Sequence, residues 1–202
     1  MTQSRLDKLN ASLSTGKLDS VILNPGPTLT YLTGLHFHLM ERPVVLLFAK
    51  DQIPALVLPE LELQKVADLP YKLQVFSYSE DPSEWDNAFR KAAQALGLDG
   101  KRIGVEPRQL RLLEFNYVKN AAPEADFPDA SEALSQLRLR KDKMEVEAMR
   151  RAVQIAQSAL EATIPLIKIG MTEKELAAEL IMQLFKHGSE PEMPFSPIVS
   201  SG

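Results

Sequence analysis

Cysteine is absent from all 202 residues of the chain. Its absence excludes disulfide bonds, thiolate zinc sites and a cysteine nucleophile within this sequence. Long hydrophobic runs are missing as well, because the longest, residues 44–49, is far shorter than the roughly 20 apolar residues of a membrane-spanning helix. Residues 1–20 are polar and lack the apolar middle region of a signal peptide. We therefore expect a soluble cytoplasmic protein with no membrane partner.

An excess of positive charge is also lacking. The chain carries 23 lysines and arginines against 27 aspartates and glutamates, which gives a net charge of -4. Nucleic-acid-binding proteins usually carry a basic patch, whereas the basic residues here are interspersed with acidic ones. No nucleic-acid partner is expected. Hydrophobic residues make up 45% of the sequence and charged residues 25%, proportions typical of folded globular proteins.

Short apolar runs and amphipathic segments alternate over residues 1–130. Strands are predicted at residues 20–24, 43–49, 53–59, 73–78 and 102–106, and the second and third are close enough to form a hairpin. Helices are predicted at residues 2–16, 61–67, 83–96 and 108–120, where apolar side chains recur every three or four positions. This alternation is typical of an α/β layer structure, with a mixed or parallel central sheet flanked by helices.

The pattern changes after residue 130, where helical segments replace the strands. Residues 131–143 are predicted to form a short helix that runs into a basic linker. The spacing of Asp142 to Glu145, and of Thr172 to Glu175, is that of a capping box, which predicts the start of a long helix at each place. Only FSPIV, residues 195–199, then has the composition of a strand. The remaining strands of a second sheet would have to follow Gly202.

Two histidines, His36 and His38, are the candidate metal ligands of the sequence. His36 and His38 lie two positions apart, so on a strand they would share a face and could bind one metal ion. No third ligand is evident in the neighbouring sequence. A partly exposed loop or strand end is therefore the favoured interpretation of this segment.

Four segments occur in a characteristic order: YLTGL at 31–35, ERPVVLLF at 41–48, LRLRKDKMEVEAMRRAVQIAQSAL at 137–160, and IGMTEKELAAEL followed by PFSPIVSSG up to residue 202. Together they resemble the Xaa-Pro peptidase and creatinase family, the pita-bread metallopeptidases that include aminopeptidase P and prolidase. The resemblance covers essentially the whole chain. It implies a creatinase-like N-terminal α/β domain at residues 1–130, a helix and linker at 131–143, and the opening helices and first strand of an incomplete pita-bread α+β catalytic domain at 144–202.

The resemblance also implies where the chemistry of the complete protein lies. In the family, two aspartates, a histidine and two glutamates bind a pair of divalent metal ions, for which manganese, cobalt and zinc are the expected ions. Because these positions would follow Gly202, no catalytic or metal-binding residue is assigned within the chain. Dimers of the family place loops of the N-terminal domain near the active site of the partner subunit. His36, His38 and Arg42 are therefore predicted to border a substrate pocket in trans, within a homodimer.

These implications lead to one expected function and two alternatives. The chain is predicted to be the N-terminal part of a metal-dependent Xaa-Pro peptidase, which cleaves the bond between an N-terminal residue and proline in peptides. Alone, it is predicted to be inactive. A fragment of a creatinase-like amidinohydrolase and a non-catalytic dimerisation or regulatory module stay open as alternatives.

Overall fold

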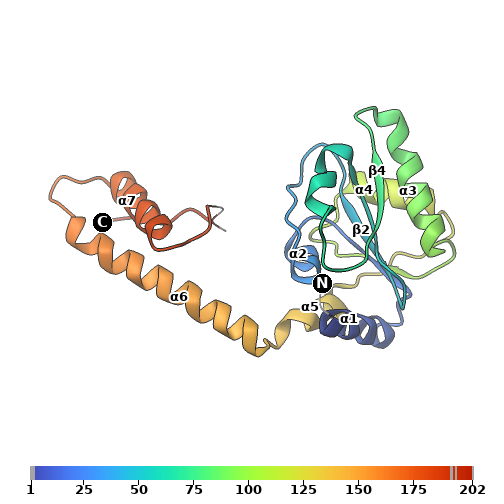
Figure 1. Cartoon of the computed structure of the whole chain (residues 1–202), viewed down its shortest axis with the longest axis horizontal. Coiled ribbons are helices and arrows are strands. Elements are labelled where there is room, and N and C mark those ends of the chain that lie inside the picture. Colours follow the sequence, from blue (N-terminus) through green and yellow to red (C-terminus); the bar gives the residue numbers. More distant parts are fainter. Residues whose placement is uncertain (1–2, 192, 194, 202) are drawn as a thin grey trace. The chain divides into compact units, whose positions relative to one another are not determined.

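The computed structural model describes residues 3–191, 193 and 195–201 (Figure 1). The chain divides into two compact units, Met1–Arg140 and Lys141–Gly202, and each is described by itself. The first unit contains the sheet, whereas the described residues of the second unit form helices and irregular segments.

A five-stranded mixed sheet forms the centre of the first unit. Its strands lie in the spatial order β4-β3-β2-β1-β5. Neighbours β1 and β2, and β2 and β3, are antiparallel, whereas β3 and β4, and β1 and β5, are parallel. The predicted hairpin is confirmed by the pairing of β2 with β3. The strands span Ser20–Leu23 (β1), Val45–Ala49 (β2), Ala55–Pro59 (β3), Gln74–Tyr78 (β4) and Ile103–Gly104 (β5).

Helices cover both faces of this sheet (Figure 1). On β2, Val45 and Leu47 point into a core shared with α3 (Pro82–Leu96) and α4 (Leu112–Ala121), while Leu46 points into a second core. The second core is shared with α1 (Gln3–Thr15), α2 (Pro27–Thr33) and α5 (Ser131–Leu139). Since successive strand residues face opposite sides, a sheet covered on both sides needs apolar residues at nearly every position. The predicted α/β class, with a mixed sheet between helices, is confirmed.

The first turn of α3 shows how local chemistry starts a helix beside the sheet. The Asp81 carboxylate accepts a hydrogen bond from the Ser83 amide at 2.9 Å, and Pro82 occupies the first helical position, where no amide hydrogen is needed. The helix ends at Gly97, whose φ of 59° is in the left-handed region. Its buried face includes Phe89, which stacks on Tyr117 of α4 with ring centroids 4.8 Å apart.

Two helical predictions differ from the structure in type or extent. The segment predicted at 61–67 is a 3-10 helix, η1 (Glu60–Val66), none of whose residues is buried, so packing does not impose α-helical geometry there. The helix predicted from residue 108 begins at Leu112. Residues 106–110 form a turn instead, in which the amides of Gln109 and Leu110 both donate to the carbonyl of Glu106 at 2.9 Å.

The second unit is built on two helices, α6 (Lys143–Thr163) and α7 (Glu173–Lys186), with a short 3-10 turn, η2 (Ile164–Leu166), after α6. The helices pack against each other. Both predicted capping boxes are confirmed: Glu145 N–H donates to Asp142 Oδ1 at 2.9 Å, and Thr172 and Glu175 make the equivalent reciprocal bonds. Among the described residues, no helix has the length and apolar character needed to cross a bilayer.

The strand predicted at residues 195–199 is not formed. Residues 195–201 have irregular backbone, and Pro194, which begins the apolar run, lies outside the described residues. A strand exists only where a neighbour accepts and donates its backbone hydrogen bonds. The composition of FSPIV favours extended backbone, but the described part of the second unit offers it no strand to pair with.

Candidate functional site

The candidate site is the α2–β2 loop, residues 34–44, which carries His36, His38 and Arg42. It leaves α2 at Gly34, which has a φ of 75° and donates its amide to the Thr30 carbonyl at 2.7 Å. A side chain would be strained at this φ, so glycine suits the position. Thr30 Oγ1 then donates to the carbonyl of Leu35, a buried residue, at 3.0 Å. The start of the loop is therefore fixed to the helix.

The middle of the loop exposes both histidines. Their backbone is irregular rather than a strand, so the shared strand face on which a two-histidine metal site would depend is not present. The carbonyl of His36 accepts a hydrogen bond from Lys65 Nζ at 3.2 Å, and the same ammonium lies 5.1 Å from the ring centroid of Phe37. The carbonyl of His38 accepts from the Met40 amide at 3.0 Å. The segment thus presents its histidine side chains outward.

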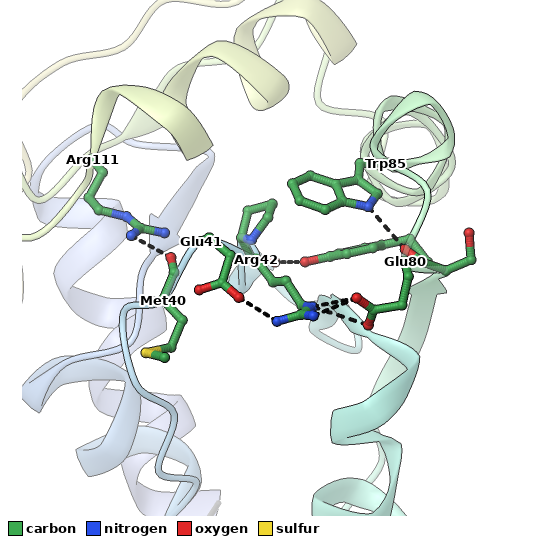
Figure 2. Close-up of polar contacts among 9 residues, drawn as sticks. Met40, Glu41, Arg42, Glu80, Trp85 and Arg111 are labelled. Atoms are coloured by element: carbon green, nitrogen blue, oxygen red, sulfur yellow. Dashed lines mark hydrogen bonds and ion pairs between the residues drawn. The ribbon is translucent and has the colours of Figure 1, made fainter.

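Arg42 forms an ion pair with Glu80, which follows β4 (Figure 2). Its Nε donates to Glu80 Oε2 at 2.9 Å and its Nη2 donates to the same oxygen at 2.5 Å, while Nη1 donates to Glu41 at 2.5 Å. The hydrogen bonds to Glu80 raise the pKa of Arg42 above its ordinary value, so the guanidinium stays charged. The contact joins the loop to the end of β4.

Arg111, at the start of α4, reaches the loop from the other side (Figure 2). Its Nη1 donates to the Met40 carbonyl at 2.6 Å, and its Nε donates to both carboxylate oxygens of Glu114 at 3.0 Å. The Glu114 side chain is fully buried. The hydrogen bonds to Glu114 also raise the pKa of Arg111. A buried carboxylate is therefore neutralised by a guanidinium that contacts the loop backbone with its remaining nitrogen.

Tyr78 fixes the end of the loop, and Trp85 lies beside the Tyr78 ring. The Tyr78 hydroxyl donates to the Pro43 carbonyl at 2.6 Å, and Trp85 Nε1 donates to the Ser79 carbonyl at 3.0 Å. Burial raises the pKa of Tyr78, so its hydroxyl keeps the proton that it donates. The two rings lie 5.1 Å apart. From Met40 to Pro43, the loop is thus attached to β4 and to the start of α4.

The exposed part of the loop is suited to contact with a ligand. Within the described residues, no group of three or more histidine, aspartate or glutamate side chains could hold a metal ion. The loop instead presents imidazole rings and the half-exposed side chains of Leu39 and Met40. Such a fixed, outward-facing segment can line one side of a pocket whose other side another surface supplies.

Four residues that attach the loop were missed by the sequence prediction: Tyr78, Glu80, Arg111 and Glu114. A local signal existed only for the last two, since arginine and glutamate three positions apart are neighbours on a helix. Nothing local links Arg111 to Met40, or Arg42 to Glu80, because these partners are 71 and 38 positions apart.

Known sequences and structures match both units. The creatinase/prolidase N-terminal domain matches residues 5–140, and metallopeptidase family M24 matches residues 147–202. The chain belongs to the creatinase/prolidase family. A curated member of similar sequence is the Xaa-Pro dipeptidase of Lactobacillus helveticus, which is 28% identical over 98% of this chain and 54% of its own length.

Solved structures of dipeptidases are similar to this chain. A dipeptidase from Pyrococcus horikoshii is 27% identical, with a TM-score of 0.78, over 90% of this chain and 49% of that one. A separately solved domain of a dipeptidase from Streptococcus thermophilus is 26% identical, with a TM-score of 0.57, over 68% of this chain and 100% of that one. The chain spans about half the length of the curated relatives it matches.

Proposed function

We propose that this chain is the N-terminal part of a metal-dependent Xaa-Pro dipeptidase or aminopeptidase of the cytoplasm. The observation that carries the proposal is the order of the two matches, the creatinase/prolidase N-terminal domain at 5–140 followed by the match to metallopeptidase family M24 at 147–202. The substrates would be peptides with proline in the second position. Proline has no amide hydrogen to offer a binding site, so such an enzyme has to recognise the ring and the flanking groups.

The role proposed for the first unit is to supply one wall of the substrate pocket of a partner subunit in a homodimer. His36, His38 and Arg42 would border that pocket. The geometry of the α2–β2 loop supports this role, because both its ends are attached to helices and strands while its histidines face outward. Because the loop is already held in place, it would lose less conformational entropy when substrate binds.

The role proposed for the second unit is to begin the catalytic domain, as a segment at 144–202 preceded by the helix and linker at 131–143. Its helix α6 exposes Met149, Val153 and Leu160, each more than half exposed, although they lie on one face. A helix with an apolar face gains most of its stability by packing that face against other structure. Further parts of the peptidase domain would supply this packing.

Two divalent metal ions, manganese, cobalt or zinc, are proposed for the complete enzyme. The residues described here do not fit such a pair, since they include no cluster of three or more suitable ligands. The ligands would have to come from other residues of the complete enzyme. Such ions would supply Lewis-acid chemistry to the complete enzyme. We assign the present residues only to substrate contact, dimer formation and structural support.

The experiment that tests the proposal compares this chain with the natural protein. The purified chain should not hydrolyse a Leu-Pro dipeptide with added Mn²⁺ or Co²⁺, and the Lactobacillus helveticus Xaa-Pro dipeptidase serves as the positive control. The natural protein, isolated from its source with its intact mass measured, should be longer and should cleave the dipeptide. Hydrolysis of the dipeptide by the 202-residue chain alone would refute the prediction that this chain is inactive. Creatine hydrolysis by the natural protein would indicate an amidinohydrolase, and a natural mass of 22.5 kDa would indicate a non-catalytic module.

A further inference from the structure

Besides the hydrogen bonds from Tyr78 and Lys65, two arginines of different character attach the α2–β2 loop to the rest of the first unit. Arg42, within the loop, pairs with Glu80, whose side chain is 63% exposed. Arg111, outside the loop, pairs with Glu114, whose side chain is fully buried, and also donates to the Met40 carbonyl. Exposed pairs are screened by salt and contribute little, whereas buried pairs are screened much less. Of the two arginines, Arg111 is therefore the one whose ion pair persists in salt and can hold the loop at Met40.

The contacts of Arg111 require a guanidinium rather than any positive charge. Its Nε and Nη2 donate to the Glu114 carboxylate. This leaves Nη1 directed at the Met40 carbonyl (Figure 2). A guanidinium carries its donors in a rigid, planar fork, so binding one partner fixes the direction of the remaining nitrogen. A lysine ammonium at the same position could pair with Glu114 but would not aim a second donor at the loop.

We propose that Arg111, oriented by buried Glu114, is a positioning residue that fixes the backbone of the α2–β2 loop at Met40. In this role neither Arg111 nor Glu114 contacts the substrate or takes part in the reaction. Glu114 fixes the direction of the guanidinium, the guanidinium fixes the Met40 carbonyl, and the neighbouring histidine and Arg42 side chains are thereby set. The benefit for substrate binding rests on the proposed function, whereas the loop conformation can be measured without it.

Hydrogen–deuterium exchange on the 202-residue chain tests the proposal directly. In Arg111→Lys, the Met40 amide, which donates to the His38 carbonyl, should exchange roughly tenfold faster or more, the effect of losing one charge-assisted hydrogen bond. The amides of β1, β2 and β3 should keep their rates, because the ion pair with Glu114 can persist. Glu114→Gln, which keeps an acceptor oxygen but loses the charge, should accelerate exchange of the same loop amide by a smaller factor.

The matched control is Arg90→Lys, which alters an exposed ion pair with Asp86 within α3 and should change neither set of rates. Unchanged loop exchange in Arg111→Lys, or equal acceleration in loop and strands, overturns the positioning role of Arg111. If the loop exchange rate is unchanged in Glu114→Gln, Glu114 has no part in positioning the loop. If the loop amide responds as expected but KM for a Xaa-Pro dipeptide does not rise in the Arg111→Lys form of the complete enzyme, the pocket role of the loop fails while the positioning role stands.

Discussion

Arg111→Met and Glu114→Gln are expected to differ in their cost to folding, although the two side chains form one ion pair. Arg111→Met leaves the Glu114 carboxylate buried with no cation, and we expect a loss of roughly 3 kcal/mol in the free energy of unfolding. Glu114→Gln leaves a guanidinium that is already 32% exposed and can turn toward water, while glutamine keeps an acceptor oxygen, so about 1 kcal/mol is expected. The asymmetry follows from which partner is buried.

Urea unfolding followed by tryptophan fluorescence is the suitable assay. Trp85 is the single tryptophan of the sequence and lies in α3, so its emission reports on the first unit. The double variant Arg111→Met/Glu114→Gln should be more stable than Arg111→Met alone, because it removes the isolated buried charge. Equal losses in the two single variants, or a larger loss in Glu114→Gln, would refute the reasoning.

Three further outcomes are expected. Gly104→Ala should cost roughly 1–3 kcal/mol in the same urea assay, because the added Cβ would lie 2.7 Å from the Cβ of Ala130, and an unchanged midpoint would contradict this. Hydrogen bonds from Ser83 lower the pKa of Asp81 below its usual 3.8, so the stability it contributes is complete above that pH and is lost as pH falls through the lower folded value. Asp81→Asn should therefore weaken the acid dependence of stability, and an unaltered pH curve would argue against it. Arg42→Ala in the complete enzyme should raise KM for a Xaa-Pro dipeptide several-fold more than it changes kcat, and steady-state kinetics that show an equal KM would count against the pocket role.

Features determined by neighbouring residues could be predicted from the sequence. The capping boxes at Asp142 and Thr172 need only a partner three residues away, and both are formed. The pairing of β2 with β3 follows from two apolar runs with a short connection. In these places local pattern and tertiary structure agree, so reading the pattern is sufficient.

Features determined by distant residues could not be predicted. The turn before α4 includes Glu106, whose side chain accepts a hydrogen bond from Thr28, 78 positions away in the sequence. The spacing of apolar residues, from which the helix was predicted, gives no information about this contact. The positions of His36, His38 and Arg42 in one loop could be read from the sequence. The residues that attach this loop, Glu80 and Arg111, come from other parts of the fold.

The division of the chain has a consequence for its synthesis. All five strands, and the helices that cover them, precede the end of the first unit at Arg140. A dipeptidase domain matched by 68% of this chain has been solved as a separate chain. At roughly 5–20 residues per second, residues 141–202 would leave the ribosome about 3–12 s later. During that interval the chain already contains every strand of the sheet, while α6, with its exposed Met149 and Val153, is still being synthesised.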